Sequence, residues 1–222
     1  MKTSLSASFM KLLFIAAIAS PSVAVFAQVR VSPMPGQPVQ PLTAVYPTTS
    51  FDREHALQAL DKGHSTIVGK ACSYHDSHVF MATGGTVVLF PATPYFDEWY
   101  KLRSQAEARH ETARISVDAF ATRVETRVDD NGRFQFTEMK PGRYYLAMAY
   151  SFDEIKSQDE YAGYSQADNL TINHYEQNNY VVMHDDQFAR PVEVTRDGQI
   201  VETALTSGNG GILRKAFPCS NL

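Results

Sequence analysis

Residues Val124–Met148 read Val-Glu-Thr-Arg-Val-Asp-Asp-Asn-Gly-Arg-Phe-Gln-Phe-Thr-Glu-Met-Lys-Pro-Gly-Arg-Tyr-Tyr-Leu-Ala-Met, and this stretch decides the fold. It holds three short runs of alternating apolar and polar residues. Asp130-Asn131-Gly132 supplies residues that tolerate positive φ, as a tight hairpin requires. Pro141-Gly142 supplies a fixed φ followed by a free one, which is typical of a type II turn. The stretch therefore predicts an antiparallel meander with one apolar side, formed by Val124, Val128, Phe134, Phe136, Tyr144, Leu146 and Met148.

Further strand patterns flank this meander on both sides. Thr86–Pro91 is the clearest, because it is a continuous apolar run with β-branched residues. Asp197-Gly198 is a second hairpin signal, which predicts that the strands before and after it pair with each other. The remaining strand candidates are Ser65–Tyr74, Asn179–His184, Pro191–Arg196 and Gln199–Thr206, with a loop or weak strand at His75–Gly85.

Helical spacing occurs in one long segment and two short ones. Phe96, Trp99, Leu102 and Ala106 recur at the helical period, so a helix is predicted over Tyr95–His110, with Thr93 as its N-cap. Short helices are predicted at Phe51–Leu60, capped by Thr49 or Ser50, and at Ser116–Ala121. Ser157–Asn178 is polar and dotted with tyrosines, and it is predicted as a long functional loop or as short elements that the pattern does not place.

Together these elements predict the fold class. Seven to eight short strands with turn residues between them indicate a mainly β protein, an antiparallel β-sandwich with one inserted α-helix. No internal repeat and no second core pattern is visible. The sandwich is therefore expected to be one domain over residues 51–222.

The first residues indicate export. Lys2 and Lys11 flank a charge-poor start, and an apolar run, Leu12–Ala19, follows them. Val25-Phe26-Ala27 then offers a small residue at a cleavage position. This pattern predicts a signal peptide over residues 1–27, with cleavage after Ala24 as an alternative. A retained membrane anchor is disfavoured, because the run is shorter than a spanning helix needs. Residues 28–50 are rich in Pro and Gln and are predicted as an extended leader.

The cysteine count and the charge set further limits. Cys72 and Cys219 are the two cysteines, and in an exported protein an even pair favours a disulfide over two separate buried thiols. The whole chain has a formal net charge of -4, and the predicted signal peptide carries two lysines and no acids. The mature chain is therefore mildly acidic with no basic block, so a nucleic acid is not an expected partner. No other stretch is long enough to span a bilayer.

Four stretches resemble carboxypeptidase regulatory-like domains, which are small prealbumin-like (transthyretin-like) β-sandwiches. The matching residues are Gly69-Lys70, Thr86–Phe90, Asp129–Phe136 and Lys140–Leu146. The resemblance covers roughly Thr66–Tyr150 and implies a prealbumin-like fold and a non-catalytic module. The chain departs from the family pattern in one place, because Pro94–Phe120 with its helix intervenes where the family has a short connection.

Two clusters are candidates for ligand binding. His75 and His78, with Asp76 between them, could share a zinc or copper ion, completed by His64, His174 or the His184-Asp185-Asp186 run. Solvated loop histidines are the simpler interpretation. The second cluster is aromatic and could stack on sugar rings or a peptide, although Trp99 also fits a core position. Its members are Tyr95, Trp99, Tyr100, Tyr161, Tyr164 and Tyr175.

Signatures of catalysis are missing from the sequence. It contains no Gly-x-Ser-x-Gly elbow, no His-Glu-x-x-His motif and no phosphate-binding loop. No cofactor is implied. The expected function is therefore that of an exported, periplasmic or secreted, non-enzymatic β-sandwich that contacts a protein in the bacterial envelope or outside the cell. A carbohydrate-binding module that uses the loop tyrosines is the main alternative, and a histidine-based metal-binding protein is a weaker one.

Overall fold

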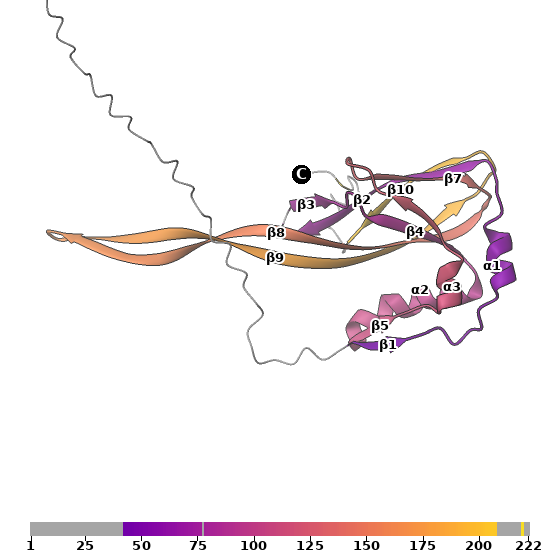
Figure 1. Ribbon diagram of the computed structural model, residues 1–222, viewed down its shortest axis with the longest axis horizontal. Helices are drawn as coiled ribbons and strands as arrows, with labels where there is room; N and C mark the ends of the chain where they lie inside the picture. Colours follow the sequence, from indigo (N-terminus) through magenta and orange to yellow (C-terminus); the bar gives the residue numbers. More distant parts are fainter. Residues whose placement is uncertain (1–41, 77, 208–218, 220–222) are drawn as a thin grey trace, which may run out of the picture.

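The computed structural model describes residues 42–76, 78–207 and 219, and it is mainly β (Figure 1). Two four-stranded sheets face each other. The first, which we call the arm sheet, has the order β6-β4-β8-β9, with β4 at Thr86–Pro91, β6 at Val124–Arg127, β8 at Gly142–Ala167 and β9 at Leu170–Val194. The second, which we call the facing sheet, is built on β2 and comprises β2 (Ser65–His75), β3 (His78–Met81), β7 (Arg133–Met139) and β10 (Ile200–Thr206). The predicted signal peptide, residues 1–27, lies outside the described residues.

The main core lies between the two sheets and follows the predicted alternation. Leu89 and Leu146 from the arm sheet are fully buried, as is Ile67 from the facing sheet. Of the apolar side predicted for the central stretch, Val124 is exposed and the other six members are buried in this core, namely Val128, Phe134, Phe136, Tyr144, Leu146 and Met148. The mainly β sandwich is therefore confirmed.

The predicted meander is wrong in its connectivity, because its three strands divide between the two sheets. Strand β6 pairs with β4, β7 pairs with β2, and β8 returns to pair with β4. The first turn forms as expected: the Asp129 carboxylate accepts hydrogen bonds from the backbone N–H groups of Asn131 and Arg133, and Gly132 has a φ of +74°. The turn carries the chain across the sandwich rather than back along its own sheet.

The second predicted hairpin is also wrong. Asp197 and Gly198 do form a turn, and Gly198 has a φ of +76°. The strand that follows, β10, crosses to the facing sheet and pairs with β2 in the parallel sense, with Ile200 opposite Thr66 and Thr206 opposite Cys72. Alternation specifies which face of a strand is buried, but it does not specify which neighbour supplies its backbone hydrogen bonds.

A helical layer covers the outer face of the arm sheet. Helix α2 (Pro94–Ala106), followed by the 3-10 turn η1 (Glu107–Arg109), agrees with the predicted helix, and α3 (Val117–Ala121) agrees with the predicted short one. Phe96 of α2 stacks on Phe90 of β4 with ring centroids 4.8 Å apart. Thr93 stands at the predicted N-cap position, since its carbonyl oxygen accepts a hydrogen bond from the backbone N–H of Asp97, but its buried hydroxyl has no partner among the described residues and does not cap the helix. Among the described helices, none is long and apolar enough to cross a membrane.

The last part of the predicted leader is packed against this helical layer. Strand β1 (Thr43–Val45) pairs in parallel with β5 (Glu111–Ala113). The Glu98 carboxylate of α2 accepts hydrogen bonds from the backbone N–H groups of Thr48 and Thr49, at 2.9 and 2.8 Å, and from the Thr48 hydroxyl at 2.8 Å. Hydrogen bonding by the Thr49 side chain, together with these three bonds, lowers the pKa of Glu98 from 4.5 to about 2. Residues 43–50 therefore belong to the folded domain, as does helix α1 (Arg53–Ala59), which Asp52 caps. Residues 28–41 lie outside the described part of the chain.

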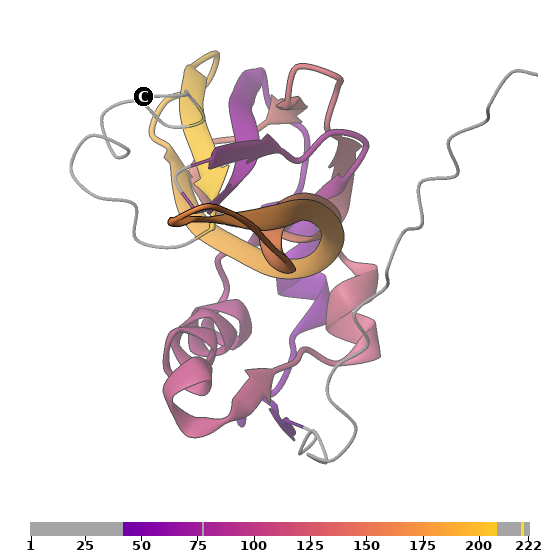
Figure 2. The same ribbon diagram turned by 90° about the vertical axis from the view of Figure 1, so that its left-hand side faces the viewer.

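The largest departure from expectation is the predicted loop Ser157–Asn178. It forms the outer half of an antiparallel hairpin in which β8 has 26 residues and β9 has 25. The two strands are in register from Gly142–Val194 to Ala167–Leu170 and are joined by a two-residue turn at Asp168-Asn169. Figures 1 and 2 show the hairpin leaving the sandwich as a long twisted ribbon. We call the segment beyond the sandwich, residues 151–185, the arm.

The predicted disulfide between Cys72 and Cys219 is present. It ties residue 219 to the facing sheet across 147 positions of sequence. The backbone N–H of Cys219 also donates to the hydroxyl of Tyr74 at 2.7 Å. Both half-cystines are buried, so the bridge forms part of the packed end of the sandwich where the arm begins.

Candidate binding surface on the arm

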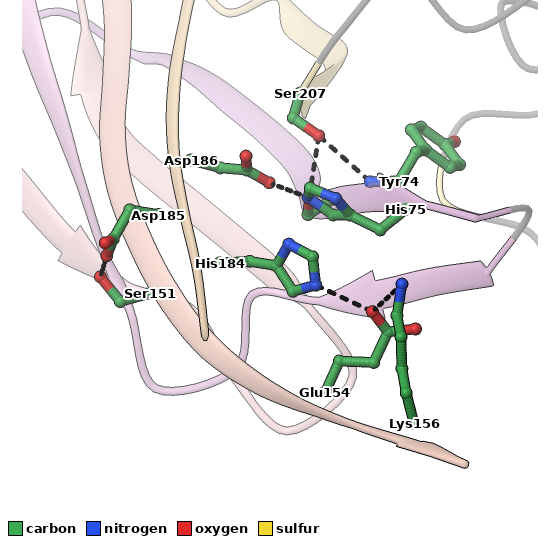
Figure 3. A network of polar contacts seen from close by, with 10 residues as sticks. Tyr74, His75, Ser151, Glu154, Lys156, His184, Asp185, Asp186 and Ser207 are labelled. Atoms are coloured by element: carbon green, nitrogen blue, oxygen red, sulfur yellow. Dashed lines mark hydrogen bonds and ion pairs between the residues drawn. The ribbon is translucent and has the colours of Figure 1, made fainter. Parts of the chain in front are cut away.

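A polar network fixes the arm to the facing sheet at the point where it leaves the sandwich (Figure 3). The Nε2 atom of His75 on β2 lies 2.8 Å from Oδ2 of Asp186 on β9. The same carboxylate accepts a hydrogen bond from the Ser73 hydroxyl, which lies 2.9 Å from the hydroxyl of Ser207. Burial opposes ionisation of Asp186, but the hydrogen bonds from Ser73 and His75 outweigh it and hold the pKa of this carboxyl below its ordinary value.

A second acid–base group lies one step further along the arm. The Nε2 atom of His184 lies 2.8 Å from Oε2 of Glu154, and the Nζ of Lys156 lies 3.4 Å from the same oxygen. Lys156 also bonds to the carboxylate of Asp76. The hydrogen bond from His184, with the charge of Lys156, lowers the pKa of Glu154, and the bond to Asp76 raises the pKa of Lys156. Strands β8 and β9 are thus joined to the end of β2.

Aromatic rings connect the two acid–base groups. The rings of His75 and His184 lie 3.9 Å apart between centroids, and Phe152 stacks on His184 at 5.0 Å. Phe80 of β3 and Tyr150 of β8 lie 4.5 and 5.2 Å from Phe152. Each histidine therefore has a carboxylate on one side and rings on another. These contacts join β2, β3, β8 and β9 at the point where the arm leaves the sandwich.

The serine hydroxyls of the network donate to carboxylates, Ser73 to Asp186 and Ser151 to Asp185. Among the hydrogen bonds of the network, none joins a serine hydroxyl to a histidine ring, so it contains no serine–histidine pair. His75 and His78, the predicted metal pair, lie opposite each other in the register of β2 and β3. His75 is bound to Asp186, and His78 is exposed on the next strand. Among residues 42–76, 78–207 and 219, no group of three or more His, Cys, Asp or Glu side chains is placed to hold a metal ion.

Beyond the network, one face of the arm carries a row of apolar and aromatic side chains. Tyr161 lies opposite Tyr175 in the register, with ring centroids 5.8 Å apart. A register shift between Tyr161 and Gly163 adds one residue, so that Tyr164, opposite Asn173, returns to the same face. We call this row the arm stripe, and it consists of Ile155, Tyr161, Tyr164, Tyr175 and Met183.

The arm stripe is open to solvent. The exposed fractions are 53% for Tyr161, 65% for Tyr164 and 61% for Tyr175, and about 70% for Ile155 and Met183. The stripe continues the face that α2 covers nearer the sandwich, where Tyr145 and Ala147 are buried. No described element lies over the outer part of this face. It is therefore an uncovered continuation of a packed sheet surface.

The arm is also acidic. Residues 157–179 contain four acids, Asp159, Glu160, Asp168 and Glu176, and no lysine or arginine. Glu160 and Glu176 are directly opposite in the register, an arrangement that is unfavourable for two like charges. Asn178 donates to Glu160 at 2.7 Å, which satisfies one oxygen without neutralising the charge. A basic surface placed against the arm would relieve this repulsion.

The sequence-predicted aromatic cluster is split by the fold. The predicted partner surface included Tyr95 and Trp99, but they are 5% and 6% exposed, and they pack in the second core between α2 and the arm sheet. Their placement on an open surface is therefore wrong, because α2 needs an apolar side to bind the sheet. Tyr100 is half-buried and stacks on Tyr145 at 4.7 Å. The other three tyrosines of the cluster lie far along the chain on the arm, so the six residues do not form one site.

Sequence reasoning missed most of the network at the root of the arm. Glu154 and Lys156 stand two residues apart on β8 and so point to the same face of the strand. Because both are charged, this alternation is not recognised from the sequence as the buried face of a strand. From the sequence, His184, Asp185 and Asp186 are predicted only as possible metal ligands. Their separate roles follow from strand alternation, since Asp185 faces Ser151 on the outer side while His184 and Asp186 face inward.

Comparisons with known proteins add little to this description. No protein-family model matches the chain, and no curated protein sequence matches it. Among solved structures, the chain is similar to a crystal structure of a candidate carbohydrate-binding protein from Pseudomonas aeruginosa. The sequence identity is 21% and the TM-score is 0.47, with 73% of this chain and 99% of that chain covered. At this level of similarity, the likeness carries no argument about function.

Proposed function

We propose that the protein is an exported, non-enzymatic binding module whose arm holds a protein partner. The observation that carries the proposal is the arm stripe, a row of exposed apolar and aromatic side chains on one face of a hairpin whose other face exposes Leu170 and Ile172 near the tip. A two-stranded hairpin with no packed layer is at best marginally stable in water. A partner that covers the stripe would supply that layer, in the way α2 does nearer the sandwich.

The chemistry of the arm favours one kind of partner. Exposed tyrosines offer large rigid faces with a polar hydroxyl, and they are enriched in protein interfaces. The four acids of residues 157–179 favour a partner surface with lysine or arginine beside its apolar patch. Both strands also have unpaired backbone edges along the outer arm, so the partner could add a strand there.

The other parts of the proposal have separate support. The disulfide between Cys72 and Cys219 suits an oxidising compartment, which agrees with the predicted signal peptide and with a periplasmic or secreted protein. The serine hydroxyls at the arm root bond to carboxylates and none bonds to a histidine ring, which favours a binding role over serine–histidine catalysis. The prealbumin-like resemblance of the sequence fits the same interpretation, since such domains generally serve as non-catalytic modules.

A carbohydrate ligand is the second candidate, and the same tyrosines favour it. Sugar rings stack on exposed aromatic faces, and Tyr164 offers such a face. The geometry of the neighbouring pair argues against it in part. Tyr161 and Tyr175 meet at an interplanar angle of 72°, edge to face, so they do not form a flat platform. A protein partner with a shaped apolar surface suits this pair better.

Site-specific photo-cross-linking in cells that make the protein tests the proposal. A photoreactive phenylalanine replaces Tyr164 in one variant and Leu57, which is exposed on α1, in the control. We expect one discrete protein adduct from position 164 and none from position 57. The adduct should weaken when Tyr161→Ser is added and when the salt concentration is raised. Equal adducts at both positions would refute a partner-specific arm, and a glycan-array signal that Tyr161→Ser removes would favour the carbohydrate alternative.

A further inference from the structure

A second surface, separate from the arm, has the features of a small-molecule site. A groove of about 760 Å³ lies on the outer face of the arm sheet, bordered by α2 on one side and by α3 and the segment before it on the other. Figure 1 shows these elements below β4 and β8. This volume lies within the usual range of ligand pockets, which are mostly apolar with a few polar groups that fix orientation.

The floor of the groove is apolar and aromatic. Phe90 and Trp99 line it, with ring centroids 5.7 Å apart, and Ala147 of β8 extends the floor. Two side chains of α3 stand at its edge in contact with solvent. Val117 is 86% exposed and Phe120 is 44% exposed, which is unusual for two apolar residues on a helix of five. An apolar ligand lying in the groove would cover both.

The rim of the groove is basic, although the chain as a whole is acidic. Arg103, Arg114 and Arg123 line it, and Glu125 is the one acidic residue among the lining side chains. Glu125 is bound to Arg123, whose guanidinium also lies over the ring of Phe120 at 4.0 Å from its centroid. Against a formal net charge of -4 for the chain, this local excess of positive charge is a distinct feature.

The arginines differ in how firmly they are held. Arg103 donates to the carbonyl oxygen of Gln187 at 2.5 Å, across the groove, which fixes its position. Arg114 is exposed and lines the groove, and its backbone N–H bonds to the carbonyl of Val45 at 2.8 Å, which holds its backbone in place. We therefore expect Arg114 to be the residue whose loss most directly removes ligand charge recognition.

We propose that this groove binds a small amphipathic anion, with an aliphatic or aromatic body against Val117 and Phe120, beside the buried Trp99, and an anionic head group beside Arg114 and Arg103. The shared chemistry is an apolar chain that ends in a carboxylate or similar anion. This site goes beyond the proposed role of the arm, because none of the residues of the arm stripe lines the groove. The two sites can therefore fail or succeed independently.

The single tryptophan provides the assay. Trp99 is the only tryptophan in the sequence and lines the groove, so its fluorescence reports occupancy directly. The full-length protein is titrated with decanoate and, separately, with decanol, which has the same chain length without the charge. We expect a saturable change with decanoate and binding of decanol that is about threefold to tenfold weaker.

Three variants complete the test. Arg114→Gln should weaken decanoate binding about threefold to tenfold and leave decanol unchanged. Arg133→Gln, on the facing sheet, is the matched control and should leave both unchanged. Ala149→Leu, which narrows the groove without touching a charge, should weaken both ligands and serves if Arg114→Gln folds poorly.

Several results would overturn the proposal. These are the absence of a saturable signal, equal affinity for decanol and decanoate, and equal effects of Arg114→Gln and Arg133→Gln. Loss of decanoate binding in a variant that lacks the outer arm would place the ligand on the arm and also refute the groove. Retention of binding in that variant, together with loss of the cross-linked partner, would show that the groove and the arm are separate sites.

Discussion

The outer arm should be removable without unfolding the sandwich. In the shallow truncation, an Asn-Gly turn replaces residues 157–179 and joins Lys156 to Tyr180, which are paired in the register. Every side chain removed is exposed, apart from the half-exposed Gly163, so almost no apolar area returns to water. We expect the free energy of unfolding to change by no more than about 1 kcal/mol, which corresponds to a shift of roughly 2–4 °C in the melting temperature.

A deeper truncation provides the contrast. Here the same turn joins Ser151 to Asp185 and replaces residues 152–184, which removes Phe152, Glu154 and His184. Phe152 packs against Phe80, Tyr150 and both histidines of the root, and Glu154 is buried. Losing this half-buried ring and the bonded acid–base group should destabilise the sandwich by about 2 kcal/mol or more.

Urea unfolding of the oxidised protein, followed by the fluorescence of Trp99, measures both variants against the intact chain. Trp99 lies in the second core between α2 and the arm sheet, so its signal reports the sandwich and not the arm. A loss of more than about 2 kcal/mol in the shallow truncation would refute the view that the outer arm is an appendage. A deep truncation as stable as the shallow one would show that the root network contributes no stability.

Three further changes test other parts of the structure. Glu98→Gln should loosen residues 43–50, which would be measured as faster amide hydrogen exchange in that segment. Because the pKa of Glu98 is about 2 in the folded state and near 4.5 in the unfolded state, the wild-type contact contributes stability above pH 4.5 and loses it as the pH falls towards 2. The free energies of unfolding of the two proteins should therefore converge at low pH. Cys72→Ser with Cys219→Ser should lower the free energy of unfolding by up to about 5 kcal/mol in a chain-entropy model, as measured by urea unfolding, and an unchanged midpoint would argue against a structural bridge. Gly63→Ala should cost more than about 2 kcal/mol in the same measurement, since the new Cβ would lie 2.5 Å from the backbone of Lys140; a neutral result would show that this segment shifts easily.

Local chemistry explains the parts of the fold that the sequence predicted well. Strand β4 has the predicted bounds, Thr86–Pro91, because a continuous apolar run with β-branched residues has few other stable conformations in a small domain. Helix α2 follows from its apolar period and from Pro94 at its first position. The disulfide followed from compartment and count alone, and the structure confirms the pairing.

Which strands pair with each other was harder to predict than which face of each strand is buried. The Asp129–Arg133 turn has the composition of a hairpin turn, and its hydrogen bonds form as such a turn requires. Nothing in its residues distinguishes a return within one sheet from a crossing to the opposite sheet, because both bury the same face of β7. The same ambiguity hides the parallel pairing of β10 with β2, which depends on contacts far along the chain.

The arm escaped prediction because its outer half buries neither face. A strand is recognised by an alternation that burial imposes, and residues 157–179 are almost all exposed. Its turn at Asp168-Asn169 was a usable local signal, since Asp168 adopts a φ of +52°, a conformation that Asp and Asn tolerate. Tyr161, Tyr164 and Tyr175 were predicted to share a binding surface, and the bulge that brings all three to one face depends on Gly163, with a φ of +125°.

The placement of β10 has a consequence for how the molecule assembles. Strand β2 lies early in the sequence, but one of its edges has no paired strand until β10 is in place. At the start of that pairing, the backbone N–H of Gln199 donates a hydrogen bond to the hydroxyl of Ser65, 134 positions away in the sequence. A fold that closes through such distant segments acquires its final topology slowly, since much of the chain must be ordered before the closing contacts form. Slow completion of the facing sheet would suit the proposed export, because the chain would stay unfolded until nearly all of it has been translocated across the membrane.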